Sequence, residues 1–349
     1  MKVVRSCNSP DFCYHSGSFL TMTSSEAAQK LLSGALVVFP TETVYGLGAL
    51  ASNDQAVRKI FEVKGRPSHN PLILHIADNS QLQELVREIP PHAQKLMERF
   101  WPGPLTICFK KSNKVSDLVS AGLPTVCIRQ PDHPAAQELL KEAGEAIAAP
   151  SANLSGKPST TSFEHAKEQL KQKGVYFLDG GKTPLGLEST VVDCSTETVR
   201  LLRPGMVSRT DLEECLRETI EDHSKASPDH ISSPGQLLEH YAPQGELMVV
   251  YGDAAQRKKW IEALPGSADV LGTFADSSPA FQGKKYELAD TEANLQAYAS
   301  ELYFFLNWCD QEQAKKIILE LPASSDPLIP ALLNRLEKAS RGHIVSLQE

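Results

Sequence analysis

Short apolar segments recur through the chain from Ala35 to Leu202, and each one ends at polar, glycine or proline residues. Besides the segment 35–39, these runs are LILHI (72–76), LTICF (105–109), TVCIR (125–129), AIAA (146–149), VYFL (175–178), STVVD (189–193) and VRLL (199–202). Their length is typical of buried strands, not of helices. Helical patterns occupy only a few intervals, at 93–100, 134–143 and 162–170. The alternation therefore predicts an α/β domain built on one twisted mixed sheet.

Local signals place the first elements of this domain. Thr23 and Glu26 have the spacing of a capping box, and Gly34 is placed to end the helix that they begin. The stretch TETVYGLG (41–48) follows a buried segment and Pro40, so we expect a loop there. The next helix must end before Pro67, which makes KGRPSHN (64–70) a second loop. Thr210 and Glu213 repeat the capping-box spacing before the last helix of the domain.

A second domain is expected after a linker. Residues 221–236 are rich in Ser, Pro, Asp and His and poor in apolar residues. Beyond them, strand and helix patterns alternate, which predicts a small parallel, Rossmann-like α/β domain. We therefore expect an N-terminal extension without clear periodicity (1–22), a larger α/β domain (23–220), a linker (221–245) and the smaller domain (246–349).

The charge and cysteine content narrow the possible functions. The formal net charge is −8, so the surface as a whole cannot act as a polycation for nucleic acid, although a local, weak RNA contact remains open. The seven cysteines contain no C-x-x-C pair, from which we expect free thiols, no zinc site and no disulfide, in a reducing compartment. No apolar run is long enough to cross a membrane, and we expect a cytoplasmic protein.

Polar and charged residues gather just outside the buried segments. In chain order they are Thr41, Glu42 and Thr43; Lys64, Arg66, Ser68 and Asn70; Thr125 and Arg129; Ser151 and Asn153; Ser189 and Thr190; and Arg203. Because the strands of one sheet end close together, we expect these groups to converge on one pocket. Fixed cations with hydroxyls suit phosphate and carboxylate ligands. The chain has no P-loop sequence and no H-E-x-x-H motif.

Each group also has a simpler explanation when it is taken alone. Lys64 and Arg66 fit exposed charges that complement a helix dipole, and Ser151 and Asn153 fit ordinary turn formers. Thr41 and Thr43 could only cap a loop, and His75 could be a hydrogen-bonded core histidine. The simpler explanations fail to account for the joint placement of the groups.

The same segments, in the same order, resemble one known family. FPTETVYGLG (39–48), KGRPSHNPLILHI (64–76), WPGPLT (101–106), TVCIRQPDHP (125–134), APSANLSGKPS (149–159), GLESTVVD (186–193) and LLRPG (201–205) are similar to the YrdC-like domain of the L-threonylcarbamoyladenylate synthases. SPG…HYAP (233–243) and the second α/β domain resemble the longer, two-domain branch of that family. The resemblance covers about residues 23–343.

This resemblance implies a nucleotidyltransferase that joins ATP, L-threonine and bicarbonate or CO₂ into L-threonylcarbamoyl-AMP and pyrophosphate. A separate transferase complex then uses the product to modify the adenosine beside the anticodon of tRNA. The implied ATP-binding residues are Lys64, Ser68, Thr125, Ser151, Ser159, Arg203 and Tyr241. The implied threonine-binding residues are Thr41, Arg66, His75, Arg129 and Ser189. Lys64 and Arg66 are the implied catalytic residues, and Mg²⁺ would be bound through the ATP phosphates and not by side chains.

The linker departs from the family pattern, because Glu239 stands where the family usually has a basic residue. Tyr241 would close over ATP as part of a lid. Two alternatives remain at this stage: an enzyme that makes carbamoyl-adenylate from carbamoyl phosphate, and a non-catalytic RNA-binding module. The absence of C-x-x-C arrays disfavours the first, and the low aromatic content disfavours the second.

Overall fold

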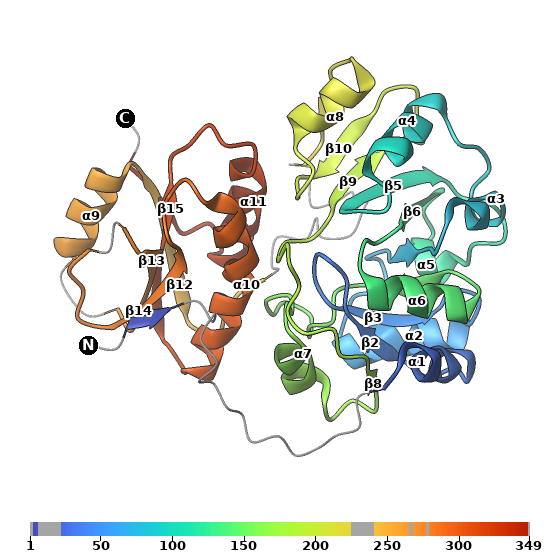
Figure 1. The fold of residues 1–349 in the computed structure, drawn as a ribbon, viewed down its shortest axis with the longest axis horizontal. Helices are drawn as coiled ribbons and strands as arrows, with labels where there is room; N and C mark the ends of the chain where they lie inside the picture. Colours follow the sequence, from blue (N-terminus) through green and yellow to red (C-terminus); the bar gives the residue numbers. More distant parts are fainter. Residues whose placement is uncertain (1–2, 6–21, 225–240, 265–267, 277–278, 348–349) are drawn as a thin grey trace. The chain divides into compact units, whose positions relative to one another are not determined.

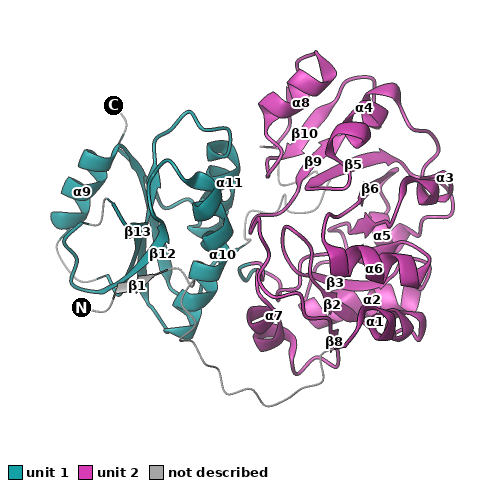
Figure 2. Cartoon of the chain, viewed as in Figure 1, with its two compact units in different colours: residues 1–20, 156–158, 239–349 teal, residues 21–155, 159–238 magenta. Residues whose placement is uncertain are grey.

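The computed structural model describes residues 3–5, 22–224, 241–264, 268–276 and 279–347 (Figure 1). The chain divides into two compact units (Figure 2). The larger unit comprises residues 21–155 and 159–238, and the smaller unit comprises residues 1–20, 156–158 and 239–349. Of the predicted linker or lid (221–245), residues 225–240, including Glu239, lie outside the described residues.

A ten-stranded mixed sheet forms the larger unit, in the spatial order β11-β10-β9-β5-β6-β4-β7-β3-β2-β8. Its strands are β2 (Val37–Phe39), β3 (Gly46–Leu50), β4 (Ile73–His75), β5 (Leu105–Lys110), β6 (Thr125–Arg129), β7 (Ile147–Ala149), β8 (Tyr176–Phe177), β9 (Thr190–Asp193), β10 (Arg200–Arg203) and β11 (Glu221–Asp222). Parallel pairs such as β4 with β6 alternate with antiparallel pairs such as β5 with β6. The expected mixed sheet is confirmed.

The helices of the larger unit pack on this sheet. They are α1 (Ser24–Leu32), α2 (Asp54–Lys64), α3 (Leu82–Leu85), α4 (Pro91–Phe100), α5 (Asp117–Ser120), α6 (Pro134–Ala143), α7 (Phe163–Leu170) and α8 (Arg209–Leu216), with a 3₁₀ turn η1 at Asn79–Gln81. Thr23 and Glu26 form the expected capping box at the start of α1. The second capping box lies two residues earlier than expected, since Ser208 and Asp211 form it and Thr210 does not.

The two faces of the sheet are covered differently. The main core fills one face, where apolar residues of α2, α4 and α8 pack on alternate strand residues such as Val126 and Ile128. On the other face, α1 and α6 pack on β2 and β7 in a second apolar cluster. The remaining part of that face carries only a small apolar cluster, composed of Ile73, Cys108, Cys127, Val191 and Leu202. This part of the sheet is therefore free to carry polar groups.

The smaller unit is a six-stranded sheet in the order β1-β14-β13-β15-β12-β16, and all neighbouring strands are parallel. Its strands are β12 (Glu246–Gly252), β13 (Val270–Phe274), β14 (Lys284–Ala289), β15 (Lys316–Pro322) and β16 (Ile344–Ser346), and its helices are α9 (Ala254–Glu262), α10 (Leu295–Gln311) and α11 (Ile329–Ala339). The expected parallel α/β arrangement is confirmed. The sequence patterns missed β14 and β16, because neither is a continuous apolar run.

Three other expectations are corrected. Part of the N-terminal extension is ordered, because β1 (Val3–Arg5) pairs with β14 at the edge of the smaller unit's sheet. The segment 41–48 is not entirely a loop, since β3 begins at Gly46. Cys108 and Cys127 form a disulfide, contrary to the expected free thiols. They lie directly opposite each other on the antiparallel strands β5 and β6, a long-range proximity that cysteine spacing does not reveal.

Candidate active site

The polar residues lie across one face of the larger unit's sheet and not only at its edge. Side chains alternate along a strand, so Thr125, Cys127 and Arg129 of β6 leave the face opposite to Val126 and Ile128. The same alternation on β4 places His75 with Ile73 on this face. Thr125, Arg129 and His75 therefore share one face of the sheet.

Lys64 is the last residue of α2, and Gly65 ends the helix with a φ of +63°, which glycine adopts without strain. The turn directs the Lys64 side chain inward, where only 4% of the residue is exposed. Its Nζ donates a 2.5 Å hydrogen bond to the carbonyl of Ser151 and another to that of Asn153. Burial, with a contribution from the charge of Arg66, holds the pKa of Lys64 well below its usual range. The interpretation of Lys64 as an exposed helix-end charge is therefore wrong.

Arg66 is also buried, and it closes the 64–70 loop on itself. Its Nε donates to the carbonyl of Asn70 at 3.2 Å, and its Nη2 donates to the Asn70 side chain at 2.6 Å and to the carbonyl of Pro71 at 2.7 Å. Ser68 lies on the same loop but is exposed, and it makes no hydrogen bond to a described residue. The loop therefore presents two buried cations and an exposed hydroxyl.

A second group forms around Arg129, at the end of β6. Its Nε donates to the carbonyl of Gly103 at 3.1 Å, its Nη1 donates to Thr43 Oγ1 at 2.7 Å, and its Nη2 lies 2.6 Å from Glu42 Oε1. Thr41 Oγ1 donates to the carbonyl of Val44, so the 2.8 Å contact between Thr41 and Thr43 requires the Thr43 hydroxyl to donate. Arg129 is thereby held by two separate segments of the chain, one with Gly103 and the other with Glu42 and Thr43.

His75 lies on the strand beside Arg129, because β4 pairs with β6 in the register His75 to Arg129. Burial, with the charge of Arg129, lowers the pKa of His75 to about 3. Its ring meets the Phe39 ring edge-to-face at a centroid distance of 5.8 Å. His75 is therefore neutral near pH 7 and is suited to hydrogen bonding, not to charge pairing.

Ser189 and Arg203 form the third group. The Thr106 and Ser189 hydroxyls are 2.7 Å apart, and Arg203 donates to the Ser189 carbonyl from Nη2 at 2.9 Å and from Nε at 3.2 Å. Arg203 Nη2 also reaches Ser189 Oγ at 3.2 Å. All three residues are buried, so the start of β9 and the end of β10 are tied together by polar contacts.

Several predicted nucleotide-binding residues cluster in the loop after β7. Ser151 forms a bridge to Gly46 of β3, and its hydroxyl donates to Asn153 Oδ1 at 2.5 Å. Ser159 is fully buried and donates to Glu188 Oε1 at 2.6 Å. Thr125 begins β6 on the same face as Arg129. Lys64, Ser151 and Asn153 are thus in direct contact, and Ser159 is bound to Glu188.

Tyr241 lies in the smaller unit. Its ring packs on the Tyr303 ring at a centroid distance of 5.3 Å, and the Arg335 guanidinium lies 5.6 Å from its centroid. Only 2% of the residue is exposed. The structure therefore gives Tyr241 a packing role in the smaller unit, and its contact with ATP stays a prediction.

Sequence reasoning missed the supporting residues of the site. The sequence assigns no role to Thr106 or Glu188, and it places Glu42 and Thr43 among the converging polar residues without a ligand. Their contacts join segments far apart in the chain, for instance Thr106 with Ser189. The available signal was the occurrence of polar residues inside otherwise apolar runs, as in LTICF.

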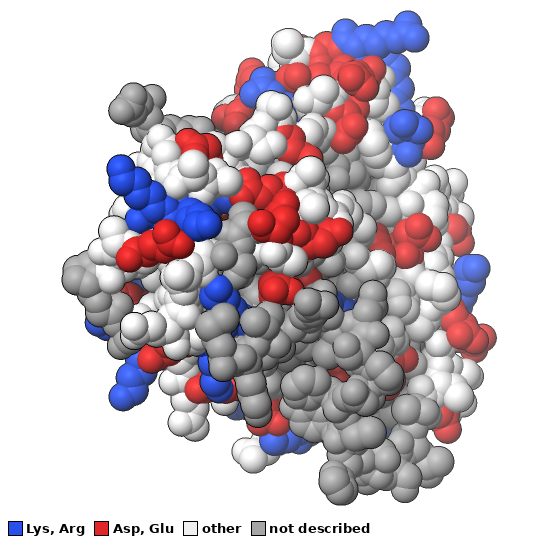
Figure 3. All heavy atoms as spheres, turned by 60° about the vertical axis from the view of Figure 1, so that its left-hand side comes forward, with Lys and Arg blue, Asp and Glu red and all other residues white. Residues whose placement is uncertain are grey.

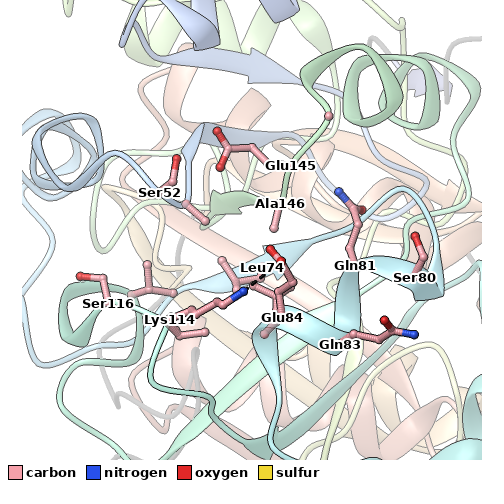
Figure 4. Close-up of a pocket in the computed structure, with 15 residues that line it drawn as sticks. Ser52, Leu74, Ser80, Gln81, Gln83, Glu84, Lys114, Ser116, Glu145 and Ala146 are labelled. Atoms are coloured by element: carbon pink, nitrogen blue, oxygen red, sulfur yellow. Dashed lines mark hydrogen bonds and ion pairs between the residues drawn. The ribbon is translucent and has the colours of Figure 1, made fainter.

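A separate pocket of about 510 Å³ opens on the larger unit (Figure 4). It contains none of the predicted site residues. Leu74 and Val119 form part of its apolar lining, and the exposed pair Lys114–Glu84, at 2.9 Å, crosses its mouth. Within the described ranges, no group of three His, Cys, Asp or Glu side chains could hold a metal ion. None of the described helices has the length and apolar character needed to cross a bilayer.

Two family models match the chain. The Sua5/YciO/YrdC model, described as "Telomere recombination", matches residues 29–205, and the Sua5 C-terminal model, described as "Threonylcarbamoyl-AMP synthase, C-terminal domain", matches residues 207–341. The threonylcarbamoyl-AMP synthases of Bacillus subtilis and Pyrococcus abyssi are 41% and 40% identical, each over 92% of this chain and 94% and 95% of their own. The crystal structure of P. abyssi Sua5 complexed with L-threonine is 39% identical and superposes with a TM-score of 0.85, covering 93% of this chain and 96% of that one. The chain belongs to the Sua5/YciO/YrdC family, in its two-domain form.

Proposed function

We propose that this protein is a threonylcarbamoyl-AMP synthase, which forms L-threonylcarbamoyl-AMP and pyrophosphate from L-threonine, bicarbonate or CO₂, and ATP. The observation that carries the proposal is the burial of Lys64 against two backbone carbonyls, with its pKa held down by burial. A buried cation without a carboxylate partner is costly unless an anion binds beside it. A nucleotide triphosphate is such an anion.

The nucleotide end of the site is built around the loop after β7. Lys64 and Ser151 are joined by a hydrogen bond, and Ser68 lies exposed on the loop that follows Lys64. We assign the triphosphate to this end, with Thr125, Ser159 and Arg203 as further ATP contacts. Tyr241 is the proposed contact from the linker, where its φ of 72° lies in a region that non-glycine residues rarely adopt.

The threonine end is built around Arg129, which is paired in register with His75, and we assign Thr41, Ser189 and Arg66 to it as further threonine contacts. Arginine forms two parallel hydrogen bonds with a carboxylate, so Arg129 suits the carboxylate of threonine. Its Nε and Nη1 donate to Gly103 and Thr43 and its Nη2 pairs with Glu42, which leaves two of its five N–H donors without a partner among the described residues. Thr41 has its hydroxyl proton committed to Val44, so it would accept and not donate a bond in this conformation.

The main barrier to the reaction is electrostatic. Carboxylation of the threonine amine gives a dianion, and its carbamate oxygen must attack the α-phosphorus of a tetra-anionic nucleotide. Lys64 and Arg66 would offset the like charges and orient both anions, which makes catalysis a matter of positioning and charge stabilisation. No protein nucleophile is required. Mg²⁺ would enter bound to the ATP phosphate oxygens, where it supplies further charge neutralisation.

We further propose that the product passes to a separate tRNA threonylcarbamoyl transferase complex and that both proteins are cytoplasmic. Direct RNA contact would be weak at most. On the face shown in Figure 3, acidic and basic side chains of the described residues are interspersed, and the acidic ones form the more continuous area. That distribution does not suit a polyanion.

The test is pyrophosphate release from ATP, with L-threonine and bicarbonate supplied together or omitted one at a time. We expect release only when both are present. Release that is independent of threonine would overturn the proposed substrate, and the absence of any release would overturn the enzymatic assignment.

A further inference from the structure

Glu42 is a carboxylate in a site that must bind anions, and its chemistry is otherwise unexplained. Only 5% of the residue is exposed. Its Oε1 lies 2.6 Å from Arg129 Nη2 as an ion pair, yet neither carboxylate oxygen accepts a hydrogen bond from a described residue. A buried carboxylate has about four positions for hydrogen-bond donors, and leaving them unfilled is costly. The Glu42 carboxylate is therefore available to accept hydrogen bonds from a ligand.

The neighbouring groups indicate that this donor is a cation from a ligand. Besides Arg129, Glu42 interacts electrostatically with His133, whose pKa is lowered by burial even though the charge of Glu42 acts to raise it. A neutral His133 leaves Glu42 with a single counter-charge. Thr43 cannot serve as the donor, because it accepts from Arg129 and donates to Thr41.

We infer that Glu42 binds the α-ammonium of L-threonine while Arg129 binds its α-carboxylate. The ammonium and carboxylate of an α-amino acid are attached to one carbon, so they lie side by side with opposite charges. The adjacent pair Glu42 and Arg129 has the complementary arrangement. This inference rests on the proposed function, which places threonine at Arg129, and it adds the residue that recognises the amine that is to be carboxylated.

The arrangement explains why this end of the site can be electrically neutral. Arg129 compensates Glu42, and the zwitterion of threonine carries no net charge, so threonine enters without changing the charge balance. Recognition of the ammonium by Glu42 would discriminate amino acids from hydroxy acids. That discrimination matters because only an amine can form the carbamate.

The experiment compares the binding of L-threonine with that of its α-hydroxy analogue, in which a hydroxyl replaces the ammonium, by calorimetry on the full chain. In the Glu42→Gln variant we expect threonine affinity to fall about 10- to 150-fold, the range of a charged hydrogen bond. Affinity for the hydroxy analogue should change by less than about threefold. Equal weakening of both ligands would show that Glu42 only positions Arg129, and unchanged threonine binding would also overturn the inference.

Two controls separate the possible failures. Asp193→Asn breaks a comparable ion pair with Arg200, at 2.7 Å on the same sheet, and should leave the selectivity unchanged. Arg129→Ala should lower the affinity for the hydroxy analogue. If the affinity does not fall, the assignment of the threonine carboxylate to Arg129 fails, while the Glu42 result still stands. If Glu42→Gln does not fold, the wild-type protein decides, because equal binding of the two ligands overturns the inference.

Discussion

Each unit buries a basic side chain, but the two are held in opposite ways. In the larger unit, Lys64 donates to the backbone carbonyls of Ser151 and Asn153, and no described carboxylate pairs with it. In the smaller unit, the fully buried Arg257 contacts Glu320 and Glu292 and donates to the Gly252 carbonyl. A carbonyl orients a cation without cancelling its charge, whereas a carboxylate cancels it. The first arrangement is suited to binding an anion, and the second stabilises a fold.

The largest expected effect is on catalysis. Lys64→Ala should reduce the rate of pyrophosphate formation by about 10²- to 10³-fold, because it removes one fixed charge that stabilises the transition state. The free energy of unfolding of this variant should not decrease much, because the substitution removes a buried charge that has no counter-charge. Steady-state kinetics and urea unfolding measure the two quantities. A loss of stability with near-normal turnover would contradict the comparison, because it would show that Lys64, like Arg257, stabilises the fold.

Arg257→Met should do the reverse. It leaves Glu320 and Glu292 without their cation, and breaking a buried pair costs about 3–5 kcal/mol of unfolding free energy. Turnover per folded molecule should stay close to that of the wild type. Chemical denaturation followed in parallel with pyrophosphate release checks this, and a specific loss of turnover would give the smaller unit a part in catalysis.

Reduction of the Cys108–Cys127 disulfide should lower the stability by about 3 kcal/mol, from the loss of a constraint that closes a short loop. Denaturation with and without reductant measures the effect. Peptide mapping after alkylation of the unreduced protein should recover the two cysteines as one cross-linked fragment. Recovery of both as alkylated thiols would restore the sequence-based expectation of a reduced protein.

The last comparison is a difference in pH dependence between the units, and near neutral pH it has the smallest effect. The pKa of His75 is lowered to about 3 by burial, so between pH 6.5 and 3 the unfolded chain takes up a proton that the folded chain does not, and stability falls by up to about 1.4 kcal/mol per pH unit. Burial raises the pKa of Glu320, so its contribution to stability has the opposite sign and grows as the pH falls. His75→Gln should flatten the acid loss and Glu320→Gln should steepen it, as measured by denaturation across pH. If the free energy of unfolding of the two variants had the same pH dependence, the burial assigned to His75 and Glu320 would be contradicted.

Much of the fold was predictable because its signals are local. The apolar runs gave the central strands of the larger unit, and the positions of Thr23 and Glu26 gave the first helix cap. Strands without a continuous apolar run, such as β14 and β16, were missed. The residues predicted to contact ligands were named from ordered motifs, and the structure brings Lys64 together with Ser151 and places Arg129 beside His75. Tyr241 packs on the Tyr303 ring of the smaller unit, and its contact with ATP stays a prediction.

The sequence by itself determined where strands and helices form and which residue types lie in the loops between them, because hydrophobic periodicity and capping act over a few residues. Only the tertiary structure decided that Cys108 meets Cys127, that Lys64 is buried and not solvated, and that Glu42 lies against Arg129. Those outcomes depend on which strands become neighbours and on how strongly burial penalises an isolated charge. Both are properties of the packed sheet, and no short segment of the chain carries them.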